Sequence, residues 1–346
     1  MARRLILHVG DCKTGSTLLQ TMLARGDCVP ETLRLFSPGP GVHSPLARSL
    51  GDRPQVYPAR WDGIAQRLEK TDWDVAVLSS ELFEFINPRK VARAVETHLA
   101  PLRAEITVLA YVRPHAGRVL SQFAENLKLG HDTGTFSDFI TRFLKLGRLN
   151  YSGRLAAWKE AFGEAFVMRP FDRDHLLDGD LRRDFLSLVL AGAPYKLIDS
   201  GQDDNASLTL PDLALMRHLQ RRFDGMPMDN RVAFGKQFGR LLREQPQAGA
   251  EKLRLPRAVY NAFAETALAD AATLDAQWLS TPVFVPALQA ISNEVLEKPQ
   301  DLNATSHHDV NTLRVAEAFA DLLMRQMNDD PKDFSKRMRA PLASSG

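Results

Sequence analysis

Short runs of apolar residues alternate with segments of helical periodicity through the first half of the chain. Four of these runs have the length of buried β-strands, and they span residues 5–9, 75–78, 106–112 and 165–168. Strands that alternate with helices in this way predict an α/β fold, in which helices flank a parallel sheet on both faces. Residues that act on a ligand are then expected at the carboxyl ends of the strands.

Changes in pattern divide the chain into regions. Residues 26–72 are rich in proline and glycine, and we interpret them as an insertion into an α/β core that spans residues 1–210. Residues 211–328 are mainly helical, and Thr209 is suited to cap the first helix of that part. Residues 329–346 are expected to form a polar tail.

Composition and charge narrow the class of protein. The chain has 346 residues, of which 44% are hydrophobic and 25% are charged, as is usual for a globular protein. Its formal net charge is only +2, so no overall field favours a nucleic acid partner. Cys12 and Cys28 are too few for a disulfide framework and indicate a reducing compartment. No apolar run is long enough for a signal peptide or a membrane span, so we expect a cytoplasmic protein without membrane insertion.

The segment after the first apolar run has the residues of a phosphate-binding loop. It reads Gly10-Asp11-Cys12-Lys13-Thr14-Gly15-Ser16-Thr17. Gly10, Gly15 and Thr17 fit the pattern GxxxxGK[ST], whereas Ser16 stands at the lysine position and Lys13 comes three residues earlier. A glycine turn before a helix still presents backbone N–H groups to an anion. No apolar run ends in the aspartate that would hold magnesium, so no metal is expected.

A second anion site is indicated at the end of the third apolar run. Arg113 follows residues 106–112, and Pro114 keeps Arg113 extended, so that its guanidinium projects from the strand end. Ser121 lies eight positions after Arg113, one to two turns into the predicted helix. A guanidinium and a hydroxyl together suit a phosphate monoester.

With these two motifs in this order, the chain resembles the sulfotransferases that use 3′-phosphoadenosine 5′-phosphosulfate (PAPS). Their 5′-phosphosulfate loop has the form Lys-[Ser/Thr]-Gly-[Ser/Thr]-Thr after the first strand, and residues 13–17 match it. Their 3′-phosphate motif has an arginine at a strand end and a serine eight positions later, as Arg113 and Ser121 have. Here no residue separates the arginine from the proline, which departs from the usual form of that motif.

The resemblance covers roughly residues 4–210 and includes weaker similarities at Tyr151, Trp158 and Asn205. It implies a P-loop-like nucleotide-binding core, PAPS as the co-substrate, and transfer of a sulfonate group to an acceptor hydroxyl. The residues that would bind PAPS are Lys13, Thr14, Gly15, Ser16 and Thr17 at the 5′-phosphosulfate, and Arg113 and Ser121 at the 3′-phosphate.

Sulfonate transfer needs a group that stabilises charge on the bridging oxygen and a base for the acceptor hydroxyl. Lys13, with the amides of the loop, suits the first role. Glu81 follows the second apolar run and is the candidate base, with a purely structural carboxylate as the alternative. Some members of the family use a histidine instead, and His43 in the insertion is the reserve candidate.

The remaining histidines and the basic residues of the second half are less diagnostic. His8 lies within a predicted strand as a core residue, and His115 is expected in the phosphate turn. His307 and His308 are adjacent and point in different directions, so they do not indicate a metal site. Six basic residues form either a solvated helical face or a surface for an anionic acceptor such as a polysaccharide: Arg217, Arg221, Arg222, Lys236, Arg240 and Arg243.

Three functions remain open on these observations. The leading hypothesis is a sulfotransferase that acts on a hydroxyl of a small molecule or a saccharide. The second is a P-loop kinase or nucleoside triphosphatase with a displaced lysine, against which the lack of a magnesium-holding aspartate argues. The third is a nucleotide-binding module without catalysis, against which the presence of Lys13 and Glu81 argues.

Overall fold

The computed structural model describes residues 2–198 and 207–339. Its contacts divide the chain into two compact units: Met1–His115, Leu149–Asp203 and Ala267–Leu288 in the first, and Ala116–Arg148, Asp204–Thr266 and Gln289–Gly346 in the second. Asn205, one of the weaker family similarities, lies outside the described residues, as do residues 340–346 of the predicted polar tail.

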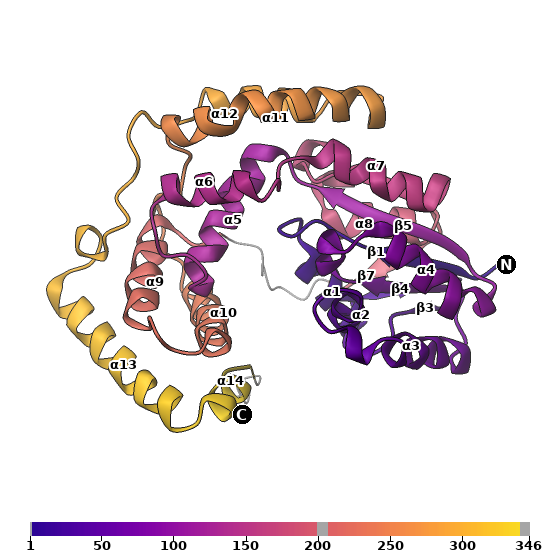
Figure 1. Ribbon diagram of the computed structural model, residues 1–346, viewed down its shortest axis with the longest axis horizontal. Helices are drawn as coiled ribbons and strands as arrows, with labels where there is room; N and C mark the ends of the chain where they lie inside the picture. Colours follow the sequence, from indigo (N-terminus) through magenta and orange to yellow (C-terminus); the bar gives the residue numbers. More distant parts are fainter. Residues whose placement is uncertain (1, 199–206, 340–346) are drawn as a thin grey trace. The chain divides into compact units, whose positions relative to one another are not determined.

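A five-stranded parallel sheet forms the centre of the first unit (Figure 1). Its strands are β1 (Arg4–His8), β3 (Leu35–Phe36), β4 (Val75–Ser79), β5 (Glu105–Val112) and β6 (Phe166–Pro170). They lie in the order β3-β4-β1-β5-β6, and each pair of neighbours is parallel. The four predicted strands and the α/β fold are therefore confirmed.

Helices surround this sheet in the first unit. They are α1 (Ser16–Arg25), α2 (Ser44–Leu50), α3 (Ala59–Lys70), α4 (Pro88–His98), α7 (Tyr151–Phe162) and α8 (Leu181–Val189), with the short 3-10 helices η1 (Pro54–Val56), η2 (Glu81–Phe85), η3 (Ala100–Leu102), η4 (Gly163–Ala165), η5 (Arg173–His175) and η6 (Leu177–Gly179). Ile6 and Leu109 pack with Leu19 of α1 and Phe185 of α8 on one face of the sheet. Leu7, which points to the opposite face, is equally buried, so both faces are covered.

The proline- and glycine-rich segment 26–72 contributes to two sheets. Its strand β3 is the edge of the five-stranded sheet, where Leu35 pairs with Val75. Its strand β2 (Cys28–Pro30) forms a separate antiparallel pair with β7 (Tyr195–Leu197). The sequence pattern predicts neither strand of this segment, because runs of two or three residues carry no periodicity.

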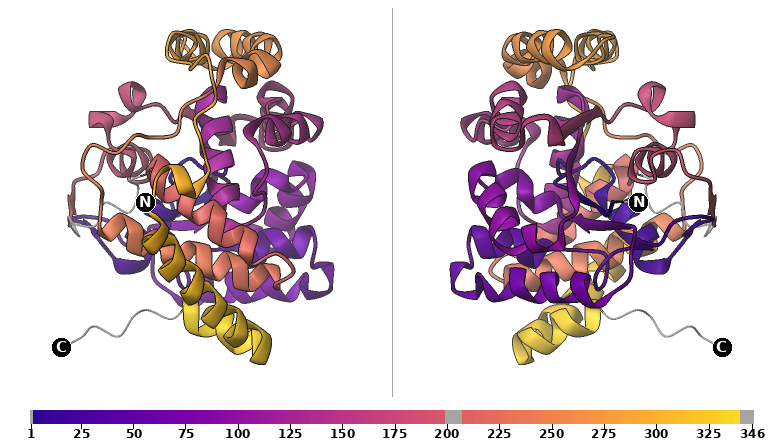
Figure 2. Two further views of the ribbon diagram at one scale, coloured as in Figure 1. Left: turned by 90° about the vertical axis from the view of Figure 1, so that its left-hand side faces the viewer. Right: turned by 90° about the vertical axis from the view of Figure 1, so that its right-hand side faces the viewer.

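The second unit is helical. It contains α6 (Phe136–Lys145), α9 (Leu210–Arg222), α10 (Met228–Glu244), α13 (Val310–Asp329), α14 (Pro331–Arg339) and η7 (Ala304–Ser306). Three further helices are divided between the two units: α5 (His115–Leu129), α11 (Arg257–Trp278) and α12 (Phe284–Ser292). Within this unit α14 contacts α10, and α13 contacts α9. Figure 2 shows α13 and α14 in yellow beside α9 and α10 in salmon.

A local sequence signal explains where α9 begins. Thr209 caps α9 as predicted, and its hydroxyl and the side chain of Asp212 exchange hydrogen bonds with each other's backbone N–H. The mainly helical character expected after residue 210 is therefore confirmed. The first part of the predicted polar tail forms α14, in which Phe334 is buried against the unit.

Helix α10 approaches α5 at a glycine. A Cβ at Gly235 would lie 2.0 Å from the carbonyl oxygen of Lys128 in α5. The side-chain amide of Gln220 donates to the same oxygen at 2.8 Å and to the carbonyl oxygen of Arg231 at 3.1 Å. The absence of a side chain at Gly235 therefore sets how closely these two helices pack.

Gly235→Ala is expected to lower the free energy of unfolding by about 2 kcal/mol or more, because a backbone oxygen can move away only if the helices separate. Gly239→Ala on the same helix is the control, since its Cβ would meet the flexible side chain of Lys128 at 3.0 Å from Cδ. That variant should stay within about 1 kcal/mol of the parent protein, helped by the helix propensity of alanine. Denaturant unfolding followed by circular dichroism measures both, and equal losses would contradict the close approach.

Candidate functional site

The loop that joins β1 to α1 lies where the order of the strands reverses. Strand β4 pairs with one side of β1 and β5 with the other, so the connections diverge at the carboxyl end of β1. In open α/β sheets, ligands bind in the crevice outside this point. Residues 10–15 form the loop there, while Glu81 follows β4 and Arg113 follows β5 at the same edge of the sheet.

The backbone of this loop turns through the left-handed region at three residues. The φ angles are 42° at Gly10, 70° at Lys13 and 76° at Gly15. A Cβ at Gly15 would lie 2.5 Å from Cδ2 of Leu181, so glycine is required directly before α1. Lys13 adopts its conformation against a cost of about 1–2 kcal/mol for a residue with a side chain. Strain of this kind is concentrated at ligand-binding and catalytic loops.

Two carboxylates hold the loop from inside the protein. Arg154 of α7 contacts both oxygens of the buried Asp11, with Nη2 at 2.7 Å from Oδ2. Burial alone would lower the pKa of Arg154, but the Asp11 carboxylate raises it overall, so this pair is charged. The backbone N–H of Cys12 donates to Oε2 of Glu84 at 2.8 Å. The roles of Asp11, Glu84 and Arg154 could not be predicted from the sequence, because no local pattern indicates pairing between residues as far apart as Asp11 and Arg154.

The N-terminus of α1 presents hydrogen-bond donors to the end of the loop. Gly15 provides no side-chain cap, and the first N–H groups of a helix have no acceptor within it. Ser16 is 5% exposed, and its Oγ has no hydrogen-bond partner among residues 2–198 and 207–339. Thr17 is exposed, whereas the buried Thr14 donates its hydroxyl to the carbonyl of Asp11 at 2.6 Å. A bound anion would satisfy the helix amides and Ser16, while Thr14 could contribute only its backbone.

His8 lies at the end of β1, directly behind the loop. Its Nδ1 is 2.8 Å from the hydroxyl oxygen of Ser79 in β4. Burial lowers the pKa of His8 to about 4, so the ring is neutral near pH 7. Its Nε2 has no partner in the described part of the chain, and a Cβ at Gly10 would lie 3.4 Å from this atom and 3.0 Å from Oγ of Ser16. Two buried polar atoms without partners therefore flank Gly10.

Glu81 lies at the carboxyl end of β4, as predicted, and is the first residue of η2. Its Oε2 accepts a hydrogen bond from the side-chain amide of Gln20 in α1 at 3.0 Å, and the same amide donates to Ser79 at 3.2 Å. The Glu81 carboxylate is thus held by α1, the helix that follows the loop, and Glu81 stays partly exposed. This position suits a base, and it also suits the structural alternative.

His43 is buried, and both nitrogens of its ring contact backbone groups, whereas a base needs a nitrogen within reach of the acceptor hydroxyl. It is 3% exposed, its Nδ1 accepts the backbone N–H of Ser79 at 3.0 Å, and its Nε2 lies 2.8 Å from the carbonyl oxygen of Pro38. Burial lowers the pKa of His43 despite these two backbone hydrogen bonds. With both nitrogens engaged in the backbone, the reserve candidate serves to join the insertion to β4.

Arg113 follows β5 directly, as predicted. Its guanidinium carbon lies 4.7 Å from the centroid of the Phe171 ring, a cation–π contact with the residue after β6. The backbone N–H of Phe171 donates to the carbonyl of Val112 at 2.7 Å, which fixes the ring beside the strand end. Ser121 lies in α5, in the part of the chain assigned to the second unit, and its pairing with Arg113 stays a prediction.

His115 belongs to a buried structural network. Its ring is stacked on Tyr151 with centroids 4.3 Å apart, and Nε2 lies 2.9 Å from Oδ2 of Asp270. Asp270 also accepts the backbone N–H groups of Tyr151 and Ser152 at the start of α7, at 3.1 and 2.9 Å. Burial alone would raise the pKa of Asp270, but hydrogen bonds from His115 and Ser152 lower it overall. His115 lies directly after Pro114, at the start of α5, and its side chain holds Asp270 at the start of α7, while its membership of a phosphate turn stays a prediction.

Several basic residues of the second unit are engaged within that unit. Arg217 is buried and donates to the carbonyl oxygens of Thr133 and Leu302, while Arg222 pairs with Asp321. The adjacent histidines each lie within 3.0 Å of a backbone carbonyl oxygen, His307 at Asp301 and His308 at Pro211. Arg221 is exposed and donates to the carbonyl oxygen of Thr133. Lys236 is exposed, whereas Arg240 and Arg243 are half-buried, and Arg240 lies 3.7 Å from Glu244.

Comparisons with protein-family models, curated proteins and solved structures give no match to this chain. None of the helices in the described ranges combines enough length with enough apolar character to span a bilayer. The described residues also contain no group of three or more His, Cys, Asp or Glu side chains that could hold a metal ion.

His8 should make the stability of the fold depend on pH. In the unfolded chain its pKa is the ordinary 6.5 and in the folded protein about 4, so the unfolded state binds more protons between these values. The free energy of unfolding should fall as the pH drops through this window, by up to about 3 kcal/mol. His8→Gln should flatten the dependence, while His43 still contributes in the same direction. Denaturant unfolding at a series of pH values measures this, and identical slopes in both proteins would contradict it.

Proposed function

We propose that this chain is a sulfotransferase that binds PAPS at the loop after β1 and transfers its sulfonate group to an acceptor hydroxyl, on a saccharide or another small molecule. The observation that carries the proposal is the loop itself. It combines Lys13, a glycine turn and the N-terminus of α1 at the reversal point of the sheet, with the buried hydroxyl of Ser16 lacking a partner among the described residues. These groups suit an anion held by several donors.

The residues at this edge fit a phosphosulfate. The helix amides and the Ser16 hydroxyl are donors, and Arg154 offsets the charge of Asp11 beneath the loop. Lys13 would place positive charge beside the bridging oxygen, where negative charge grows as the S–O bond breaks. The match of residues 13–17 to the sulfotransferase motif favours sulfonate over phosphoryl transfer.

Glu81 is the proposed base. The acceptor oxygen forms a bond to sulfur, the bond from sulfur to the bridging oxygen breaks, and the proton of the acceptor hydroxyl passes to the Glu81 carboxylate. The hydrogen bond from Gln20 fixes one oxygen of this carboxylate and orients the other. Because Gln20 lies in α1, the orientation of the base and the position of the loop depend on one helix.

Arg113 is the proposed contact for the 3′-phosphate. The Phe171 ring orients its guanidinium at the end of β5, the strand next to β1. Such an arginine would distinguish a nucleotide that carries a second phosphate from one that lacks it. In this proposal Ser121 is the hydroxyl partner indicated by the sequence spacing.

The protein should bind 3′-phosphoadenosine 5′-phosphate without magnesium, and more tightly than adenosine 5′-phosphate. Arg113→Ala should weaken that binding by at least about tenfold, since a hydrogen bond to a charged group contributes about 1.5–3 kcal/mol. Arg314→Ala, an exposed arginine of α13, is the matched control and should leave binding unchanged. Isothermal titration measures all three proteins.

Equal affinity for the two adenine nucleotides would remove the reason for a 3′-phosphate site. Tighter binding of ATP or GTP that requires magnesium would instead support the kinase or nucleoside triphosphatase alternative.

Glu81→Gln should lower turnover by at least about a hundredfold, because a general base typically contributes about 10²–10⁴ in rate. The variant keeps the shape of the side chain, so nucleotide affinity and melting temperature should stay as in the parent protein. Turnover with labelled donor, nucleotide binding and melting are measured on one preparation. A lower melting temperature with near-normal turnover would show that Glu81 is a structural carboxylate, and nucleotide binding without turnover even in the parent protein would favour a non-catalytic module.

A further inference from the structure

A cavity of about 410 Å³ opens in the first unit at the opposite end of η2 from Glu81. Three cationic side chains and no acidic one belong to its lining, which consists of Ser49, Leu50, Pro54, Tyr57, Asn87, Arg89, Lys90 and Arg93. The cations come from the first two turns of α4, which Asn87 caps by accepting the backbone N–H of Arg89. Positive side chains at a helix N-terminus add to the field of the helix dipole, so this cavity favours an anion.

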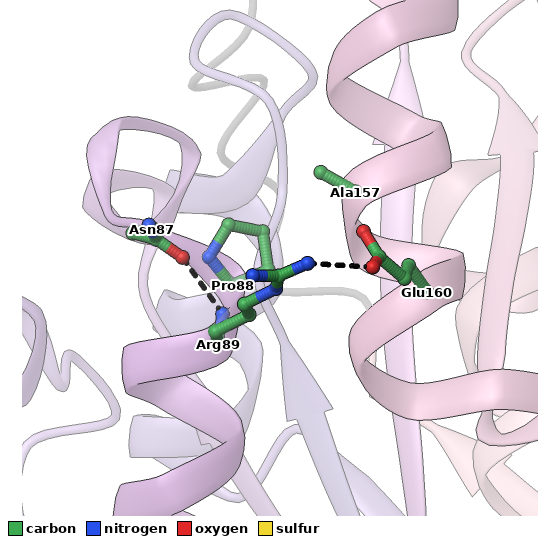
Figure 3. Close-up of a pocket in the computed structure, with 5 residues that line it drawn as sticks. All are labelled: Asn87, Pro88, Arg89, Ala157 and Glu160. Carbon is green, nitrogen blue, oxygen red and sulfur yellow. Dashed lines mark hydrogen bonds and ion pairs between the residues drawn. The ribbon is translucent and has the colours of Figure 1, made fainter.

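The cations of the cavity differ in what they already contact. Arg89 donates to Glu160 of α7 at 2.6 Å, and this pair lies in a smaller neighbouring recess of about 340 Å³ (Figure 3). Lys90 and Arg93 are exposed and form no ion pair within the described part of the chain. The Arg89–Glu160 pair therefore borders the cavity, and Lys90 and Arg93 are the cations available to a ligand.

Tyr57 gives the cavity a fixed hydroxyl. Its oxygen lies 3.2 Å from Nε2 of His98, and Nδ1 of His98 lies 2.7 Å from Oδ1 of Asp62. A carboxylate can only accept, so Nδ1 of His98 carries a hydrogen, and in the tautomer that leaves Nε2 without one, Nε2 accepts the hydroxyl of Tyr57. The lone pairs of the Tyr57 oxygen then remain to accept a hydrogen bond from a ligand hydroxyl.

We propose that this cavity binds an oxyanion-bearing, polyhydroxylated ligand, with its negative group at Lys90 and Arg93 and a hydroxyl at Tyr57. Its role as a subsite for the acceptor rests on the function proposed above, whereas binding of the ligand does not. Glu81 is the first residue of η2, which ends at Phe85, and Asn87, two residues further along the chain, lines the cavity. Five residues of 3-10 helix extend about 10 Å, at about 2 Å per residue. An acceptor anchored in the cavity must therefore be longer than one sugar ring to reach Glu81.

The test uses the full chain and two saccharides that differ only at their carboxyl groups. One is a tetrasaccharide that carries uronic acids, and the other is the same compound with its carboxyl groups reduced to hydroxymethyl groups. Isothermal titration at low ionic strength compares the parent protein with Lys90→Ala/Arg93→Ala, with Tyr57→Phe, and with Lys70→Ala, an exposed lysine of α3 outside the cavity lining. Binding of 3′-phosphoadenosine 5′-phosphate is measured on the same proteins.

The acidic tetrasaccharide should bind at least about tenfold more tightly than the reduced one, and the double variant should lose at least about tenfold, as expected for charge-assisted hydrogen bonds. Tyr57→Phe should weaken binding of both saccharides by a similar factor, and Lys70→Ala should change neither. Equal affinity for the two saccharides, or an equal loss in Lys70→Ala, would overturn the proposal. Nucleotide binding should be unaffected by the double variant, so failure of the nucleotide site and failure of this cavity are separable results.

Discussion

The carboxylate of Asp11 is buried under the loop that follows β1, and a buried charge must be neutralised. The position of the loop at this edge of the sheet depends on that neutralisation. Asp11 is fully buried at the end of β1, and Arg154 of α7 is the side chain that balances it. Removing one partner of a buried pair typically costs about 3–5 kcal/mol, because it leaves an uncompensated charge in the interior. The loop is therefore held to α7 more firmly than its glycines would suggest, and its strained backbone at Lys13 can persist.

The same arrangement keeps the loop compatible with an anion. Two acidic residues close to an anion site would ordinarily repel the ligand. Here Asp11 is paired with arginine, and Glu84 accepts the backbone N–H of Cys12 and so uses its charge to shape the turn. The donors at the end of the loop are the first N–H groups of α1 and the buried hydroxyl of Ser16, and the carboxylate of Glu81 lies at the end of the neighbouring strand. The hydrogen-bond donors of the loop and the proton acceptor Glu81 thus lie at different positions along one edge of the sheet. Transfer of a group to a hydroxyl needs both, donors for the leaving group and a base for the hydroxyl.

Much of the fold could be predicted from the sequence, because strands buried on both faces are continuous apolar runs. The strands that end at His8, Ser79 and Val112 show this pattern, and their parallel pairing brings Glu81 and Arg113 to the edge where the loop lies. Contacts between distant segments could not be predicted. Nothing near His115 reveals that Asp270 is its partner, and nothing near His43 shows that both ring nitrogens are taken by backbone groups.

The network around Asp270 also bears on how the chain folds during synthesis. Its carboxylate supplies the partner for His115 and for the first amides of α7, although 118 residues separate it from Ser152. The first unit is therefore not a continuous stretch of chain: until α11 has left the ribosome, the buried imidazole of His115 and the N–H groups of Tyr151 and Ser152 lack the Asp270 carboxylate. A nascent fragment that ends before α11 would contain all five strands of the sheet but not the Asp270 carboxylate. Such long-range closure slows folding and prolongs the exposure of apolar strands in the nascent chain.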